Sequence, residues 1–356
     1  MEIPEDTIEI REGEQLDWLD IADYLRTHLP AIGEGTIAVR QFPSGASNLT
    51  YLVRIGNWEG VLRRPPFGPI PPKAHDMQRE ASLLRGVHPV FSLAPEVYLF
   101  CDDLSIIGVP FYMMERRRGI VLDDTFPSGM TPTPELCRRI SLSVVDTLVK
   151  IHAIDWQAAA LDTFGHPTGF LERQVKGWTE RYTRARTEEI PEVEPLMRWL
   201  IEHTPVSPAP TLIHNDFKLN NILLNVQDLA EPVAVLDWEM ATIGDPLFDL
   251  AITLAYWVEP TDSEELQSLI PAVTTLPGFI SRAQFMQRYS TQSGRDLSSL
   301  HFYMTFAYFK LAVILQQIYV RWKRGQTGDQ RFAVFGSHVR VLIRHATQLA
   351  DGRLQH

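Results

Sequence analysis

LIHNDFKLNNILL (residues 212–224) and VAVLDWEMATIGDPLFDLA (residues 233–251) are the runs of sequence that decide the fold. Each is an apolar run with an acidic residue at or near its end, Asp216 in the first and Asp237 in the second. Asn221 lies five residues after Asp216. The pattern predicts a loop and a short strand, a polar turn, and a second strand that ends at Asp237. Such a hairpin would hold the three polar side chains close together at one end.

These three side chains suit phosphoryl transfer. A nucleoside triphosphate needs metal ions to neutralise its charge, and a carboxylate must accept the proton of the attacking hydroxyl. Asn221 and Asp237 are hard oxygen donors suited to Mg²⁺, and Asp216 is the candidate base. The spacing H-x-D-x-x-x-x-N, from His214 to Asn221, matches the kinase catalytic loop. Taken singly, such residues are ordinary turn or capping residues, but here spacing, residue type and strand context agree.

The second motif reads Asp237-Trp238-Glu239, with Asp237 in the place of the metal-binding Asp of D-F-G but without Phe and Gly. Asp245 and Asp249 follow. Together the motifs resemble the aminoglycoside phosphotransferase and choline kinase family, most nearly the phosphotransferase-like domain fused to some acyl-CoA dehydrogenases. The resemblance covers roughly residues 12–325. It implies that Asp245 and Asp249 support the catalytic loop, and that His214, a catalytic-loop candidate, braces the loop rather than shuttling a proton.

The resemblance also implies an α+β, two-lobed fold like that of protein kinases. Residues 1–118 would form a β-rich nucleotide-binding lobe with a leading helix, which the apolar spacing from Trp18 to Leu29 predicts. Residues 119–356 would form a mainly helical lobe that carries the catalytic loop and the acceptor site. The runs with strand character before residue 118 are 37–42, 49–55, 60–63, 95–101 and 109–114.

The expected nucleotide-binding residues begin with a small, polar turn. Ser44, Gly45, Ser47 and Asn48 lie between the first two strands, and in the family this loop covers the phosphates, since backbone N–H groups approach phosphate closely only where side chains are small. A plain hairpin turn is the alternative. Arg63, on the third strand, stands in the place of the phosphate-pairing lysine. Its guanidinium can bridge phosphate and carboxylate; an arginine exposed on an edge strand is the alternative.

A helix predicted over roughly 74–85 carries Glu80 on the same face as Met77, Ala81 and Leu84. A carboxylate on an otherwise apolar face suggests a partner, and Arg63 is the natural candidate. The alternative is that Glu80 pairs with a neighbour on its own helix.

Met113, Met114, Glu115 and Arg116 are the candidate hinge, where kinase-like folds bring backbone groups to the adenine edge. The two methionines could equally be strand core, and both roles are compatible. The arginines at 116–118 could form a solvated turn or attract an anionic substrate.

Composition excludes several classes of function. With 356 residues and a net charge of −11, a general affinity for nucleic acid or anionic membranes is not expected. The two cysteines make neither a disulfide framework nor a metal site, so a reducing cytoplasm is expected. The acidic N-terminus is not a signal peptide. The apolar run from Phe302 to Val320 is interrupted by Lys310, Gln316 and Gln317, so it predicts a buried helix rather than a membrane span.

The helical half contains two further features. A helix is expected to start near Thr133 and to end at His152, which we interpret as a structural histidine. Glu188, Glu189, Glu192 and Glu194 form an acidic patch that is either a solvated helix face or a site for a cationic substrate. Two last helices are expected over 300–324 and 335–349.

The sequence thus predicts a Mg²⁺-dependent kinase that uses ATP or GTP to phosphorylate a small-molecule hydroxyl, as a monomer or homodimer. The acceptor could be a hydroxyacyl-CoA or a cationic aminoglycoside or amino alcohol. The alternative is a pseudokinase that binds nucleotide as a sensor or scaffold, which Arg63 keeps open. Protein-kinase activity is disfavoured by the missing Phe and Gly and by the lack of an A-P-E stretch.

Overall fold

The computed structural model describes residues 6–43, 48–68 and 75–354. The chain divides into two compact units. The first contains Met1–Gly119 and Val233–Glu239, and the second contains Ile120–Pro232 and Met240–His356. A simple boundary after residue 118 omits the return of Val233–Glu239 to the first unit. Ser44, Gly45 and Ser47 lie outside the described residues.

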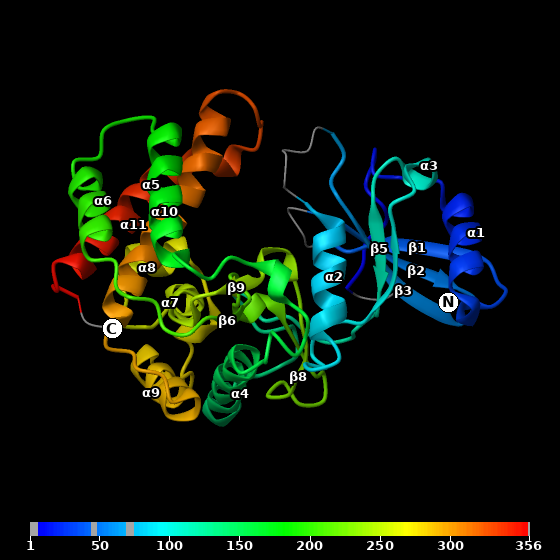
Figure 1. Cartoon of the computed structure of the whole chain (residues 1–356), viewed down its shortest axis with the longest axis horizontal. Helices are drawn as coiled ribbons and strands as arrows, with labels where there is room; N and C mark the ends of the chain where they lie inside the picture. The colour runs from blue at the N-terminus through cyan, green and yellow to red at the C-terminus, as the bar shows by residue number, and fades with distance from the viewer. Residues whose placement is uncertain (1–5, 44–47, 69–74, 355–356) are drawn as a thin grey trace. The chain divides into compact units, whose positions relative to one another are not determined.

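An antiparallel five-stranded sheet forms the centre of the first unit (Figure 1). Its order is β1-β2-β3-β5-β4, and Arg63 of β3 lies opposite Tyr112 of β5. Figure 1 shows helices α1 and α2 on opposite faces of this sheet. The elements are α1 (Trp18–His28), β1 (Ile37–Gln41), β2 (Leu49–Ile55), β3 (Trp58–Arg64), α2 (Met77–Val87), β4 (Val97–Cys101), α3 (Leu104–Ile107) and β5 (Phe111–Met114).

Local sequence explains the helices of the first unit. The Asp17 side chain accepts hydrogen bonds from the N–H groups of Leu19 and Asp20, so it caps α1. Asp76 caps α2 in the same way by accepting from Arg79 N–H. Asp103 caps the short helix α3, which lies between the two predicted strands 95–101 and 109–114.

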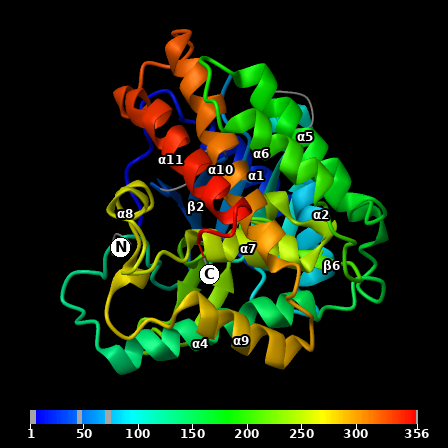
Figure 2. The ribbon, with the colours of Figure 1, turned by 90° about the vertical axis from the view of Figure 1, so that its left-hand side faces the viewer.

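The second unit is mainly helical. Figure 2 shows α4 beside α9 and α10 beside α11, and the two helices of each pair pack against one another. The helices are α4 (Pro134–His152), α5 (Phe170–Ala185), α6 (Val193–Glu202), α7 (Pro246–Tyr256), α8 (Glu264–Leu269), α9 (Arg282–Ser293), α10 (Leu300–Lys323) and α11 (Phe335–Ala350). The strands are β6 (Thr211–Ile213), β7 (Ile222–Leu224), β8 (Pro232–Val235, whose last three residues belong to the first unit) and β9 (Thr242–Gly244).

Short 3₁₀ helices occur in both units. They are η1 (Pro30–Ile32), η2 (Asp162–Phe164), η3 (Leu219–Asn221), η4 (Trp238–Met240), η5 (Val273–Thr275) and η6 (Gln330–Val334).

Side-chain caps mark the starts of α4 and α7 in the second unit. The Thr133 hydroxyl accepts from Leu136 N–H, which confirms the predicted start of α4. Helix α7 begins at Pro246, earlier than the apolar run from Leu250 suggests, because Asp245 caps it and proline is favoured in the first turn. A β-rich first unit and a helical second unit confirm the predicted fold class. Within the described residues, every helix is too short or too polar to cross a membrane.

Candidate active site

The catalytic loop follows β6, which pairs antiparallel with β9 in the second unit. The two peptide N–H groups at its start both donate to one buried carboxylate. His214 N–H donates to Asp249 Oδ2 over 2.8 Å, and Asn215 N–H donates to Asp249 Oδ1 over 2.6 Å. His214 itself is fully buried beside Phe217. This environment favours the bracing role expected of His214 over a role in proton transfer.

Asp249 belongs to a buried network that reaches α4 and α9. His152 Nε2 lies 3.1 Å from Asp249 Oδ2, and His152 Nδ1 lies 2.7 Å from the Tyr289 hydroxyl. His152 is therefore a structural histidine, as predicted. Burial alone would raise the pKa of Asp249, but the hydrogen bond and charge of His152 and the His214 contacts hold this pKa below its ordinary value.

Asp245 caps the start of α7, the helix that carries Asp249. Its carboxylate accepts from Leu247 N–H over 2.9 Å and from the Tyr303 hydroxyl over 2.7 Å. Burial raises the pKa of Asp245, although both hydrogen bonds oppose the rise. Asp245 and Asp249 thus make the supporting contacts that the family resemblance implies.

Asp216 and Asn221 are in direct contact, as the motif spacing predicts. Asn221 Nδ2 donates to Asp216 O over 2.8 Å and to Asp216 Oδ2 over 3.0 Å. Lys218 Nζ also lies 3.2 Å from Asp216 Oδ2, and its ammonium sits 4.8 Å from the ring centre of Tyr256. Both contacts of the Asp216 carboxylate fall on Oδ2. Because the Asn221 amide nitrogen is used by Asp216, the amide oxygen is the atom that could meet a cation.

The first unit contains the second half of the predicted residues, gathered around Arg63. Its guanidinium lies 3.2 Å from Glu80, 2.6 Å from Asp237 and 3.5 Å from Glu239. The predicted Arg63–Glu80 pair is confirmed. Both alternatives are therefore wrong. Arg63 is not an exposed residue on an edge strand, and Glu80 has a partner outside its own helix. We call Arg63, Glu80, Asp237 and Glu239 the Arg63 cluster.

The Arg63 cluster has unusual backbone and electrostatic features. Asp237 has a φ of 65°, in the left-handed region that Asp tolerates better than most residues and that is often found at functional sites. Glu80 is buried, and this burial raises its pKa to about 7 against the opposing attraction of Arg63. One cation therefore faces three carboxylates.

Of the expected phosphate-loop residues, Asn48 falls within the described residues. It is buried, and its Nδ2 donates to Glu239 over 2.7 Å. His75 Nδ1 lies 2.9 Å from Asn48 Oδ1. Asn48 is thus joined to the Arg63 cluster through Glu239, while Ser44, Gly45 and Ser47 remain predictions.

The candidate hinge lies at the end of β5. Met113 is fully buried in the apolar cluster under α1, so its side chain is strand core. Glu115 N–H donates to Glu96 O over 2.8 Å, so this amide is already used. A role of Met113, Met114, Glu115 and Arg116 toward adenine remains a prediction.

The three arginines at 116–118, of which the first belongs to the candidate hinge, are each paired with a carboxylate. The pairs are Arg116 with Asp6 (2.5 Å), Arg117 with Glu115 (2.7 Å) and Arg118 with Glu59 (2.7 Å). Their charges are therefore compensated within the first unit, which weakens the idea that they attract an anionic substrate.

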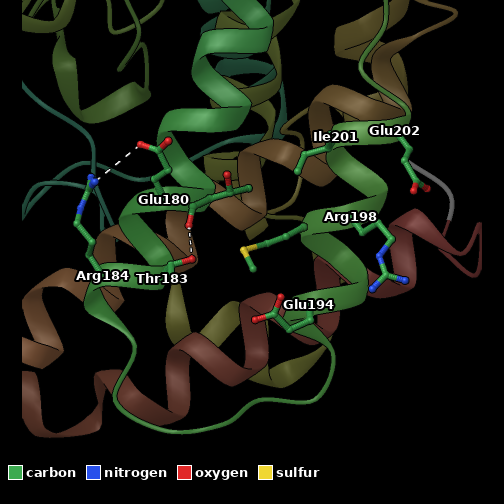
Figure 3. Close-up of a pocket in the computed structure, with 9 residues that line it drawn as sticks. Glu180, Thr183, Arg184, Glu194, Arg198, Ile201 and Glu202 are labelled. Atoms are coloured by element: carbon green, nitrogen blue, oxygen red, sulfur yellow. Dashed lines mark hydrogen bonds and ion pairs between the residues drawn. The ribbon is translucent and has the colours of Figure 1, made fainter.

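Two of the four carboxylates of the acidic patch in the second unit are paired with arginines. Glu188 pairs with Arg340 over 2.6 Å, and Glu194 pairs with Arg186 over 3.2 Å. Glu188 and Glu189 lie between α5 and α6 rather than on a helix face. A hollow of about 550 Å³ lies between these two helices. Figure 3 shows that Arg184 and Arg198 line it together with Glu180, Glu194 and Glu202. The mixed charge does not single out a cationic ligand.

Three residues near these contacts are not predicted by sequence reasoning. Glu239 is the third carboxylate at Arg63, Lys218 contacts Asp216, and Lys310 lies 3.2 Å from Asn215 Oδ1. Lys310 had a signal, since it is a charged residue inside an otherwise apolar run. Glu239 had none beyond its place in the motif, because its partner Asn48 is 191 residues away.

The predicted ligands Asn221 and Asp237 each offer an oxygen donor of the kind that Mg²⁺ prefers. Among the described residues, no three His, Cys, Asp or Glu side chains gather to form a protein-only metal site. Mg²⁺ usually takes one or two protein oxygens and completes its shell with water and substrate phosphates. One amide oxygen from Asn221 and one carboxylate from Asp237 are such donors, and their chemistry suits Mg²⁺ better than softer metals.

Comparison with known proteins identifies the family. A model of the phosphotransferase enzyme family matches residues 38–279. Acyl-CoA dehydrogenase family member 10 of Mus musculus is 35% identical over 331 residues, which cover 92% of this chain and 29% of that protein. Family member 11 of Rattus norvegicus is 33% identical over 358 residues, covering 98% and 45%. The chain spans less than half the length of these relatives.

Solved structures agree on the fold. A candidate aminoglycoside phosphotransferase from Ralstonia eutropha JMP134 has a TM-score of 0.81 at 26% identity, covering 95% of this chain and 99% of that one. An aminoglycoside phosphotransferase in a ternary complex with AMP-PNP and hygromycin B has a TM-score of 0.60 at 16% identity, covering 93% and 98%. The predicted kinase-like fold and the predicted class of enzyme, one that transfers a phosphoryl group to an alcohol, are confirmed at the level of the family. The chain belongs to the phosphotransferase enzyme family.

Proposed function

We propose that this protein is a Mg²⁺-dependent kinase that transfers the γ-phosphoryl group of ATP or GTP to a hydroxyl of a small molecule. The contact of Asp216 with Asn221 carries the proposal, because it reproduces the base-to-metal-ligand pair that the motif requires. The AMP-PNP complex of a structurally similar phosphotransferase supports the use of a nucleoside triphosphate.

Each residue has a proposed role. Asp216 accepts the proton of the acceptor hydroxyl at Oδ1, since Asn221 and Lys218 both engage Oδ2. Asn221 and Asp237 hold Mg²⁺, which when bound neutralises charge on the phosphates. Arg63 contacts the phosphates, and its pair with Glu80 orients the guanidinium. Ser44, Gly45, Ser47 and Asn48 cover the phosphates, and Met113, Met114, Glu115 and Arg116 face the adenine.

The acceptor is a small molecule that carries a hydroxyl. The relatives named acyl-CoA dehydrogenases support a hydroxyacyl-CoA, because a kinase domain and a dehydrogenase in one chain would act on related compounds. The candidate aminoglycoside phosphotransferase supports a cationic acceptor instead. All three arginines at 116–118 and two of the four glutamates of the acidic patch are paired within the chain, so neither patch gives a strong reason to prefer an anionic or a cationic acceptor. The protein is proposed to act in the cytoplasm as a monomer or homodimer, without nucleic acid or membrane as partners.

One experiment tests the kinase against the pseudokinase. The stability of the wild type is measured with ATP, GTP and AMP-PNP, with and without Mg²⁺, and phosphate transfer is then followed with a panel of hydroxyacyl-CoAs and amino alcohols. We expect Mg²⁺-dependent stabilisation that Asp237→Ala abolishes. Asp216→Asn should keep this binding and lose about 10²–10⁴-fold in kcat, the usual size of a general-base contribution.

A matched control is Asp296→Asn, which changes a carboxylate that caps Ser298 in an exposed turn. It should transfer phosphate at the wild-type rate. Equal turnover of wild type and Asp216→Asn with every acceptor would refute the enzymatic proposal. Nucleotide binding without any transfer would favour the pseudokinase.

A further inference from the structure

Helix α10 packs against α5, α7 and α11 in the interior of the second unit (Figure 2). Between Phe302 and Val320 it carries one charged residue, Lys310. Lys310 is only 5% exposed, and its ammonium lies 5.0 Å from the ring centre of Phe248 and 5.6 Å from that of Trp178. Burial lowers the pKa of Lys310 to about 8. An apolar side chain would avoid this desolvation, so the lysine requires another explanation.

The ammonium points at the residue directly before the proposed base. Lys310 Nζ lies 3.2 Å from Asn215 Oδ1 and 3.4 Å from Asn215 O. Asn215 has a φ of 69°, in the left-handed region, which asparagine tolerates better than most L residues. A cation on both Asn215 oxygens stabilises that conformation.

Asn215 is held from three separate elements. Asp249 of α7 accepts its N–H over 2.6 Å, Met240 O of η4 accepts from its Nδ2 over 3.3 Å, and Lys310 of α10 donates to its oxygens. Removing one of these contacts would loosen a left-handed turn that leads directly into Asp216. A carboxylate displaced by about 1 Å can lose on the order of 10² in rate.

The charged groups around Lys310 come from several elements. Asp216 of the catalytic loop and Asp249 of α7 favour its charged form, while Arg181 of α5 and Lys218 of the loop oppose it. Attraction and repulsion thus partly cancel, and the two contacts to Asn215 are what direct the ammonium.

We propose that Lys310 is a positioning residue for phosphoryl transfer, an inference that rests on the proposed function. It fixes the Asn215–Asp216 peptide in the turn that presents the base, and it does not touch the substrate itself. In this view α10, which lies about 95 residues beyond the loop, sets the geometry of the base.

The test compares Lys310→Met with Gln316→Leu in the full-length chain. Gln316 is a matched control because it is a buried polar residue of the same helix, but its Nε2 donates to Ala185 O over 2.8 Å and not to the loop. Three quantities are measured: amide hydrogen exchange of the peptide 212–221, AMP-PNP affinity with Mg²⁺, and Mg²⁺-dependent hydrolysis of ATP with water as acceptor.

We expect Lys310→Met to speed exchange of the loop at least tenfold and to lower the hydrolysis rate about 10²-fold, with AMP-PNP affinity within about threefold of wild type. Gln316→Leu should change none of these more than twofold. Lys310→Arg, which keeps a buried donor and charge, should restore at least a tenth of the rate. If Lys310→Met does not fold, Lys310→Gln takes its place in the test. We expect the same changes in loop exchange, hydrolysis rate and AMP-PNP affinity for this variant.

Loop exchange and hydrolysis that stay at wild-type values in a folded Lys310 variant would overturn the proposal. Equal losses in Lys310→Met and Gln316→Leu would also overturn it, since they would show a general loss of packing. If the wild type neither hydrolyses nucleotide nor transfers phosphate to any acceptor of the panel, the proposed function fails. The exchange of the loop then still decides whether Lys310 holds Asn215.

Discussion

The Arg63 cluster and the network of Asp249, His152, Tyr289 and the N–H groups of His214 and Asn215 (the Asp249 network) differ in their balance of charge. In the Arg63 cluster one guanidinium faces three carboxylates, from Glu80, Asp237 and Glu239. In the Asp249 network one carboxylate receives two peptide N–H groups and His152. The first therefore has an excess of negative charge, while the donors and the acceptor of the second are matched.

This difference indicates which part changes when ligands bind. A cluster with surplus carboxylate is stabilised by an incoming cation, and Asp237 is the proposed metal ligand within it. A buried carboxylate whose oxygens all receive donors gains nothing from a ligand and resists displacement. We infer that the Arg63 cluster rearranges when nucleotide and Mg²⁺ bind, whereas the Asp249 network keeps the catalytic loop fixed.

The largest effect should come from breaking the fixed network. Asp249→Ala removes the acceptor of two buried N–H groups and of His152, each worth about 1–3 kcal/mol when left unpaired. We expect a loss of about 4 kcal/mol in the free energy of unfolding, measured by urea denaturation monitored by circular dichroism. Asp296→Ala, an exposed capping change, is the control. A loss below about 1 kcal/mol would show that the network is not a structural centre.

A smaller effect is expected at the Arg63 cluster. Arg63→Met leaves Glu80 without its cation, but the pKa of Glu80 is already raised to about 7, so a proton can replace the lost charge. We expect about 2 kcal/mol of destabilisation at pH 7, against the larger loss that usually follows breaking a buried ion pair. Arg63→Lys should recover part of this loss.

The same urea titration at pH 5 separates the causes. Destabilisation by Arg63→Met should shrink at pH 5, because Glu80 is then protonated in both proteins and Arg63 has no charged Glu80 to pair with in the wild type. A loss that is equal at both pH values would mean that packing, not charge, determines the effect.

The effect that is smallest for each pH step is the pH dependence of stability. The folded pKa of Glu80 is about 7 and its unfolded value is near 4.5, so the folded state binds more protons between these values. Stability should therefore fall as pH rises from about 4.5 to 7. Within this window we expect the free energy of unfolding to change by about 1 kcal/mol for each pH step of one.

Glu80→Gln should flatten this slope when the free energy of unfolding is measured across that range. Asp249 acts in the opposite sense, because its lowered pKa makes stability fall as pH drops below its ordinary range. A slope that Glu80→Gln leaves unchanged would assign the pH dependence to another group.

Sequence reasoning works for features that short-range spacing encodes. The spacing of Asp216 and Asn221 predicts their contact, and the apolar face around Glu80 predicts the pair with Arg63, because both follow from local geometry. Capping chemistry likewise predicts the start of α4 at Thr133. These signals need only a few neighbouring residues.

The remaining features depend on tertiary contacts that periodicity does not report. Asn48 reaches Glu239 across 191 positions, and Lys310 reaches Asn215 across 95. A charged residue inside an apolar run indicates that a partner must exist, but not which one. The sequence does not predict the short helix α3 or the strand β9, because neither has enough residues for a periodic pattern.

The return of Val233–Glu239 to the first unit has a consequence for synthesis on the ribosome. After Gly119 has emerged, a further 120 residues (239 − 119) must be translated before the unit has all its parts. At 5–20 residues per second that takes roughly 6–24 s. During this interval Arg63 has Glu80 but not Asp237 or Glu239. The sheet of the nascent chain therefore lacks two of its four cluster residues for several seconds. Chaperones that bind nascent chains can act on it during this time.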